Sequence, residues 1–411
     1  MFCPDARPLA VALLLACALA SHAAPYTPQS DSEVVERLPL TSDPSVRRVE
    51  SLRRQLAARP EDTTLRVEIA RRYFELAMAQ GDPRFVGYAS SAIAPLAANP
   101  RAKVEDSAGY WLVRGQIQQF SHDFEAALIS LAKASQLAPS SPDPLSWRIA
   151  IFMVQARYAE ALAEAERLMP LAEPLLGLGW KAYVGATTGQ LEAAFQEVSN
   201  AIKPATSNAA SAANTAPTPA PELLLWQYTR LADMAWRLQR IELAEDYFKS
   251  ALKLGLTDQY LLGAYADFLL ARQRPAEVLK LLAGWERSDI LLLRLALAGR
   301  AAGDGRAADW AAQLRDRFKA AEQRGDRLHE QEAARFELDI ERNTAKALAL
   351  ASRNYQIQKE PRDAEILLRA ALAAKQPKAA QPALDWLRSS RHEDPLIVKL
   401  AEQLAAQGAT R

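Results

Sequence analysis

Small residues recur along this chain with a period of about 34 residues, and this spacing limits the fold more than any other feature. Ala127 is followed by Ala161 after 34 residues and by Ala194 after a further 33. A bulky residue stands four positions after the first of them, at Leu131. Residues three and four apart share one face of a helix. The pattern therefore predicts repeated helices that approach closely at the small residues.

A second small position lies twelve residues before each of these, which predicts two helices in every repeat. It is occupied by Gly115 in the best-formed repeat. Three repeats depart from the rule, with Ile149, Arg335 and Leu368 at this position. The early and middle repeats are therefore better formed than the last two.

A 34-residue period with helical spacing in both halves resembles the tetratricopeptide repeat. Repeat 108–141 carries the small, bulky and turn residues of that family at their usual offsets: Trp111, Gly115, Ala127, Leu131, Ala134 and Pro139. The resemblance implies an all-α fold, a right-handed superhelical α-solenoid of tetratricopeptide helix hairpins. Each hairpin, of helices A and B, would bury its apolar face only by stacking on its neighbours.

The composition agrees with a helical repeat protein and excludes some partners. The 411 residues exceed what one hydrophobic core usually serves. Hydrophobic residues make up 49% of the chain, and glycine is sparse, at 16. A net charge of +1 gives no global field for nucleic acid, which we therefore do not expect as a partner.

The first 23 residues resemble a secretory leader. An apolar run from Leu9 to Ala20 precedes small residues suited to cleavage after Ala23. The only cysteines are Cys3 and Cys17, so the mature chain would have none. We expect a periplasmic or secreted protein with no transmembrane span. As an alternative, LLAC resembles a lipobox, which would make Cys17 a lipidation site and the protein an outer-membrane lipoprotein.

The chain divides into six predicted segments. These are a signal peptide (1–23), a flexible linker (24–45), an N-terminal repeat array (46–202), a linker rich in Pro, Ala, Ser and Thr (203–222), a C-terminal array (223–390), and a capping helix with a tail (391–411). The interval from Ala194 to Ala244 exceeds one period by sixteen residues. This favours a loop inserted into one continuous array over two arrays on a flexible joint.

Catalytic and metal-binding constellations are scarce. HEQEA (329–333) begins like a zinc-peptidase motif, but position 333 is Ala, so the second ligand is missing. We expect a helix start at His329 and turns at His122 and His392. Gly303 and Gly305 fit a turn between helices A and B. We predict no cofactor, no metal and no enzymatic activity.

With catalytic motifs scarce, the surface of the repeats is the remaining candidate for a binding site. In the tetratricopeptide family helix A usually lines a concave groove, and its outward positions bind ligands. Carried onto this chain, these positions are Gln116, Gln119, Tyr183, Trp226, Asp233, Trp236, Tyr260, Asp267 and Arg300. The resemblance implies a scaffold that binds a protein or peptide of unknown identity.

The aromatic and acidic residues in this set favour a basic or aromatic partner. The family's basic carboxylate clamp is not evident, which argues against an acidic peptide terminus. Two alternatives stay open. One is a lipid-anchored member of an envelope assembly or transport complex. The other is a glycan-binding or glycan-processing protein that uses groove aromatics and carboxylates, with Asp233 and Asp267 facing one ligand.

Overall fold

A computed structural model describes residue 30, residues 44–206 and residues 219–409. The signal peptide, Cys17, most of the 24–45 linker and the centre of the 203–222 linker lie outside the described residues. The chain divides into two units, Met1–Arg47 and Arg48–Arg411. Helix α2 begins at Pro44, in the first unit, and every later helix lies in the second unit.

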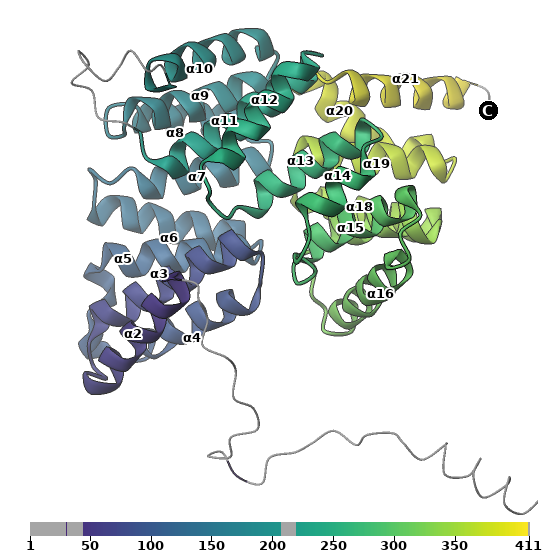
Figure 1. Ribbon diagram of the computed structural model, residues 1–411. Helices are drawn as coiled ribbons and strands as arrows, with labels where there is room; N and C mark the ends of the chain where they lie inside the picture. The colour runs from purple at the N-terminus through teal and green to yellow at the C-terminus, as the bar shows by residue number, and fades with distance from the viewer. Residues whose placement is uncertain (1–29, 31–43, 207–218, 410–411) are drawn as a thin grey trace, which may run out of the picture. The chain divides into compact units, whose positions relative to one another are not determined.

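The described residues form helices and no strands, and successive helices pair into antiparallel hairpins (Figure 1). A single helix comes first, α2 (Pro44–Ala58). The first four hairpins are α3 (Thr63–Gln80) with α4 (Arg84–Ala97), α5 (Ala108–Phe120) with α6 (Phe124–Leu137), α7 (Asp143–Val154) with α8 (Tyr158–Leu168), and α9 (Pro174–Thr187) with α10 (Leu191–Thr206). Two short 3₁₀ turns, Pro100–Ala102 and Val104–Asp106, link α4 to α5.

The remaining hairpins follow the inserted segment. They are α11 (Pro221–Arg237) with α12 (Ile241–Lys253), α13 (Gln259–Ala271) with α14 (Pro275–Leu281), α15 (Asp289–Ala302) with α16 (Ala307–Gln323), α17 (Glu330–Phe336) with α18 (Thr344–Ile357), and α19 (Pro361–Ala373) with α20 (Gln381–Ser390). A π-helical turn, Glu337–Glu341, extends α17, and a 3₁₀ turn, Pro377–Ala380, precedes α20. The last helix is α21 (Pro395–Ala409). The predicted fold class, an all-α right-handed solenoid of tetratricopeptide helix hairpins, is confirmed.

The small residues pack as the repeat predicts. Ala127 and Leu131 are fully buried between α5 and α6. A Cβ added to Gly115 would lie 2.7 Å from a Leu131 side-chain carbon, so only glycine allows this approach of the two helices. The small residues that recur about every 34 residues are therefore the positions at which the two helices of a hairpin make contact.

The turn between the two helices of a hairpin has a repeated backbone conformation. In six hairpins one residue of this turn has a left-handed backbone conformation, with φ between 56° and 60°. These residues are His122, Ala156, Gln239, Gln273, Arg342 and Lys375. Glycine takes this role at Gly303, with φ of 70°. The predicted turn positions of His122 and Gly303 are thus observed.

The apolar core is continuous across the inserted segment. Helix α10 ends at Thr206, inside the segment predicted as a linker, and α11 begins at Pro221. Side chains of α10, such as Phe195 and Ile202, belong to one buried cluster with Leu224 and Tyr228 of α11. Hairpins on either side of the insertion therefore share one core.

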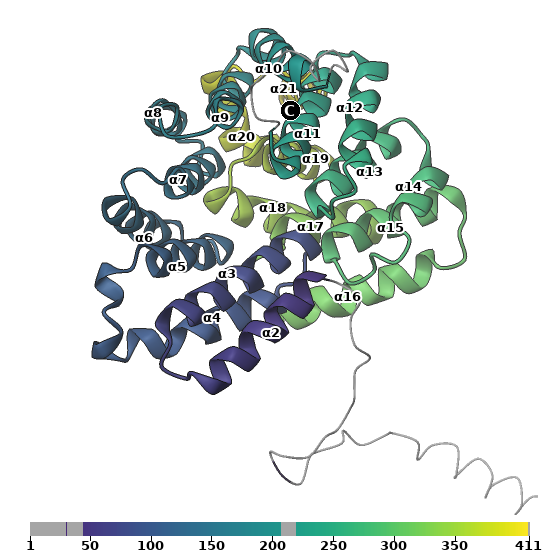
Figure 2. The same ribbon diagram turned by 60° about the vertical axis from the view of Figure 1, so that its left-hand side comes forward.

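The C-terminal hairpins also contact hairpins far away in the sequence (Figure 2). The indole N–H of Trp386 donates to the Tyr158 hydroxyl at 2.7 Å, and the Lys359 amide donates to the Val154 carbonyl at 2.7 Å. Hairpin α19–α20 with α21 therefore lies against the turns of the α7–α8 and α9–α10 hairpins. This contact closes one side of the space that the A helices border.

Candidate functional site: a cavity between the A helices and the C-terminal hairpins

A cavity of about 490 Å³ lies between the A helices of the middle hairpins and the C-terminal hairpins. Helices α9, α11, α13 and α15 supply one set of walls, and α17, α19 and α21 supply the other. Its volume falls within the range of about 300–1,000 Å³ that is typical of ligand pockets. Because several A helices each present a few side chains, the wall combines residues that are separated along the chain.

Five of the nine predicted site residues line this cavity together: Tyr183, Asp233, Trp236, Tyr260 and Asp267. They come from α9, α11 and α13, so the expectation that helix A presents its outward positions to one space agrees with their placement. Whether they bind a ligand stays a prediction.

The other four predicted residues do not reach the cavity. Gln116 is buried in α5, and its side-chain carbonyl has no hydrogen-bond partner in the described residues. Gln119 is half-buried on the same helix. The Trp226 ring packs against Trp180, with their centroids 4.9 Å apart. Arg300 donates to the backbone carbonyl of Ile340 at 2.8 Å. Gln116 is thus buried, and Trp226 and Arg300 are engaged in local contacts that spacing does not reveal.

Asp267 is not a free carboxylate. Its two oxygens accept separate hydrogen bonds, one from Arg294 at 2.6 Å and one from Arg335 at 2.7 Å. Burial alone would raise the pKa of Asp267, but the charges of the two arginines lower it well below its usual range. It therefore stays ionised and is neutralised from within the chain. Asp267 therefore supplies no free negative charge to attract a basic partner, and it carries no proton to donate as a general acid.

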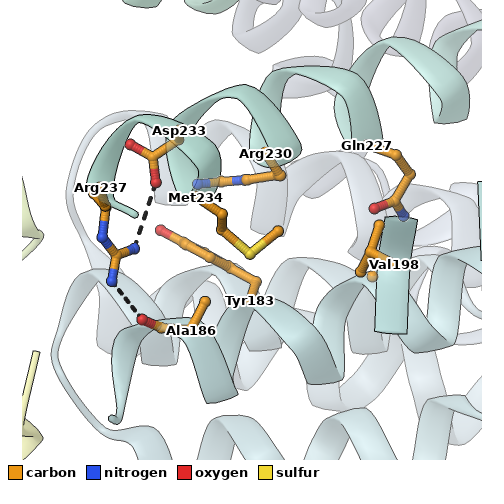
Figure 3. Close-up of a pocket in the computed structure, with 9 residues that line it drawn as sticks. Tyr183, Ala186, Val198, Gln227, Arg230, Asp233, Met234 and Arg237 are labelled. Atoms are coloured by element: carbon orange, nitrogen blue, oxygen red, sulfur yellow. Dashed lines mark hydrogen bonds and ion pairs between the residues drawn. The ribbon is translucent and has the colours of Figure 1, made fainter. Parts of the chain in front are cut away.

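Stacked side chains form the wall beside α9 and α11. Figure 3 shows the Arg230 guanidinium over the Tyr183 ring, and its central carbon lies 3.6 Å from the ring centroid. Arg237, on the same helix, pairs with Asp233 at 3.5 Å and donates to the Ala186 carbonyl at 2.6 Å (Figure 3). Burial raises the pKa of the Tyr183 phenol, which stays neutral. Its hydroxyl lies 3.4 Å from a Glu360 oxygen, to which it donates.

The turn before α21 closes the cavity at its other side. His392 is buried in this turn, with its ring 5.1 Å from that of Trp386 and its Nδ1 3.3 Å from the Thr187 carbonyl. Burial, together with the nearby charge of Arg237, lowers the pKa of His392 to about 3, so the imidazole is neutral. The Glu393 side chain accepts from the Leu191 amide at 2.7 Å and thereby caps α10. The predicted turn at His392 is observed, and its side chains contact other helices of the same chain.

Sequence reasoning missed most of the charged wall. Arginines 230, 237, 294, 335, 362 and 369 all line the cavity, and none of them was predicted. One signal was present, because Arg335 replaces a small residue in the repeat pattern. That departure coincides with its ion pair to Asp267. The arginines of α11 and α19 break no rule of the repeat and left no comparable sign.

The described residues contain no group of three or more His, Cys, Asp or Glu side chains placed to hold a metal ion. His329 begins α17, and its ring lies 3.9 Å from the Glu332 carboxylate. In the same described part of the chain, no helix has the length and apolar character needed to cross a bilayer.

Comparisons with known proteins add little. No family model matches the sequence, and no curated protein matches it. The Rap protein complexed with competence and sporulation factor is similar in structure, at 13% identity and a TM-score of 0.44, over 88% of this chain and 99% of that one. Yeast Tom70 is similar at 11% identity and a TM-score of 0.40, over 89% and 86%.

A third similar structure is the APC/C hetero-tetramer Cut9–Hcn1, at 10% identity and a TM-score of 0.39, over 88% of this chain. This chain spans about half of that one, 52%. All three TM-scores are below 0.5, so the tetratricopeptide-like fold rests on the helices and contacts described above.

Proposed function

We propose that this protein is an exported scaffold that binds a peptide segment of a partner protein in the cavity between its A helices and its C-terminal hairpins. The observation that carries the proposal is the meeting of three aromatic side chains, Tyr183, Trp236 and Tyr260, on one wall of a pocket of about 490 Å³. Tyr, Trp and Arg dominate the binding energy of protein interfaces. The role needs no catalysis.

Trp236 provides the sharpest test. Its ring and that of Phe268 are nearly perpendicular, with centroids 5.4 Å apart, and Trp236 also lines the cavity. Peptides selected from a random library on the wild-type chain are expected to lose about tenfold or more in affinity for Trp236→Ala, because truncation of an interface anchor costs at least about 1.4 kcal/mol.

The matched control is Tyr88→Ala. Tyr88 is an aromatic residue on α4 that is 52% exposed and does not line the cavity. It should leave the affinity unchanged. If both variants bind the selected peptides as the wild type does, the cavity is not the binding site.

Export is the second part of the proposal and rests on the N-terminal sequence alone. Mass spectrometry of the protein from its native host should find a mature chain that begins at Ala24. A chain that instead begins at Cys17 and carries a fatty acid would favour the lipid-anchored alternative. A chain that keeps Met1 and is recovered with the cytoplasm would contradict both.

A further inference from the structure

Two arginines lie close to the Tyr260 ring in the cavity wall. The Arg230 guanidinium carbon is 5.2 Å from the ring centroid, and that of Arg362 is 4.9 Å from it. Arg230 also donates to the Tyr260 hydroxyl at 3.2 Å. These residues come from α11, α13 and α19, so only the contact between distant hairpins brings them together.

These two arginines differ from the other four in the cavity. Arg237 pairs with Asp233, Arg294 and Arg335 pair with Asp267, and Arg369 pairs with Asp339. In the described parts of the chain, no carboxylate lies within ion-pair distance of Arg230 or Arg362. The Arg362 guanidinium makes no hydrogen bond to a described residue, and the buried Nε of Arg230 has no acceptor there. Donors remain on both.

Glu360 lies nearby and affects both guanidinium groups electrostatically. Asp233 also acts on Arg230, and Asp267 and Glu332 also act on Arg362. Both arginines are protonated at every accessible pH. Because no described carboxylate lies within ion-pair distance of either one, their charges have no direct partner in this partly buried site. An unpaired charge in such a site is costly, and an anionic ligand that pairs with it removes this cost.

The chemistry of the wall favours a carboxylate over a phosphate. A carboxylate is planar and accepts two parallel hydrogen bonds from a guanidinium. It brings one negative charge, whereas a phosphate brings nearly two, close to Glu360 and Asp394 in the same wall. Apolar side chains, including Ile366, Leu396 and Leu400, line the cavity opposite α11 and suit an apolar neighbour of the carboxylate.

We propose that Arg230 and Arg362, both beside the Tyr260 ring, bind the carboxylate of an acidic peptide. The inference rests on the proposed function and reverses the sequence-based expectation of a basic partner. The site differs from the family's basic carboxylate clamp, which is not evident in the sequence, because it is formed only where α11, α13 and α19 meet.

Selection from a random eight-residue peptide library on the immobilised full chain tests this inference. Half of the library ends in a free carboxylate and half in an amide. The wild type is expected to enrich peptides that contain Asp or Glu, or peptides with a free terminus, and the two halves distinguish a side-chain carboxylate from a terminal one. Affinities should fall as salt rises, because the contact is between charges.

Arg362→Gln is the informative variant, since its guanidinium makes no hydrogen bond to a described residue and its loss should leave the fold intact. Affinity for the selected peptides should fall about 10- to 100-fold, the value of a charged hydrogen-bonding group. Arg362→Lys should recover part of that loss, because it restores the charge without the planar fork. Arg324→Gln, an exposed arginine outside the cavity, is the matched control.

The outcomes separate the two proposals. Enriched peptides without acidic groups, or acidic peptides that bind Arg362→Gln as well as the wild type, would overturn the carboxylate site and leave peptide binding intact. No enrichment by the wild type would overturn the proposed function and the carboxylate site with it. An equal melting temperature for the wild type and Arg362→Gln shows that any loss of affinity is local.

Discussion

The α5–α6 hairpin and the α17–α18 hairpin are built on the same plan, yet their interiors differ. In the first, Gly115 and Ala127 let two helices meet with apolar side chains between them. In the second, Arg335 stands where a small residue is expected, and Glu330, Glu332 and Glu337 are buried.

The difference lies in the neighbours of each hairpin. Helices α5 and α6 pack mainly on each other and on adjacent repeats. Helix α17 likewise meets α15 and α19 of the adjacent hairpins, but its Arg335 also pairs with Asp267 of α13, two hairpins away. A repeat pattern describes contacts between sequential neighbours. Where a hairpin touches a distant one, charged residues replace the pattern and are neutralised by partners from other hairpins. Four substitutions test this contrast.

The largest effect is expected at the charged contact. Asp267→Asn would leave Arg294 and Arg335 buried without their carboxylate, and breaking a buried ion pair costs about 3–5 kcal/mol. Urea unfolding followed by circular dichroism measures this change in the free energy of unfolding. Asp246→Asn, an exposed residue of α12, should change it by less than about 0.5 kcal/mol. Equal effects would show that the ion pairs do not stabilise the fold.

The apolar contact should be sensitive to size and not to charge. Ala127→Leu overfills the α5–α6 interface and is expected to cost about 1–3 kcal/mol. Ala163→Leu makes the same change at an exposed position of α8 and should be nearly neutral. An unchanged melting temperature for Ala127→Leu would contradict the assignment of the small residues to this contact.

The contact at His392 should depend on pH. Its folded pKa of about 3 lies below the ordinary value of 6.5, so the folded protein binds fewer protons than the unfolded chain. Stability is therefore lost as pH falls below 6.5, by about 2 kcal/mol at pH 5 from this residue. His392→Asn keeps a donor for the Thr187 carbonyl and should reduce the loss of stability between pH 7 and pH 5. An identical pH dependence in both proteins would show that His392 titrates freely.

The smallest effect is expected at the cap of α10. Glu393→Ala removes the acceptor of the Leu191 amide and should cost about 1 kcal/mol, as the loss of a helix cap does. Glu393→Gln keeps an acceptor oxygen and should cost less. Similar melting temperatures for wild type and Glu393→Ala would show that water replaces the cap.

The sequence was sufficient for the fold and for half of the site. Period and residue size predict the hairpins because each hairpin interface is local, and Tyr183, Trp236 and Tyr260 follow from their positions on helix A. Arg362 and Glu360 could not be placed in the same way. Their roles depend on how far the stack curves before α19 meets α9, which is a sum of small angles that no single repeat encodes.

The cap that Glu393 places on α10 limits how the number of hairpins can change in a chain with this fold. An open array gains or loses whole repeats with little penalty, since each unit contacts only the next. Here the turn before α21 must arrive at the start of α10, so a duplicated or deleted hairpin between them would move Glu393 and His392 away from their partners. The number of hairpins from α10 to α20 is therefore fixed by closure, and we expect change in length to be confined to segments outside that span or to loops such as the one between α10 and α11.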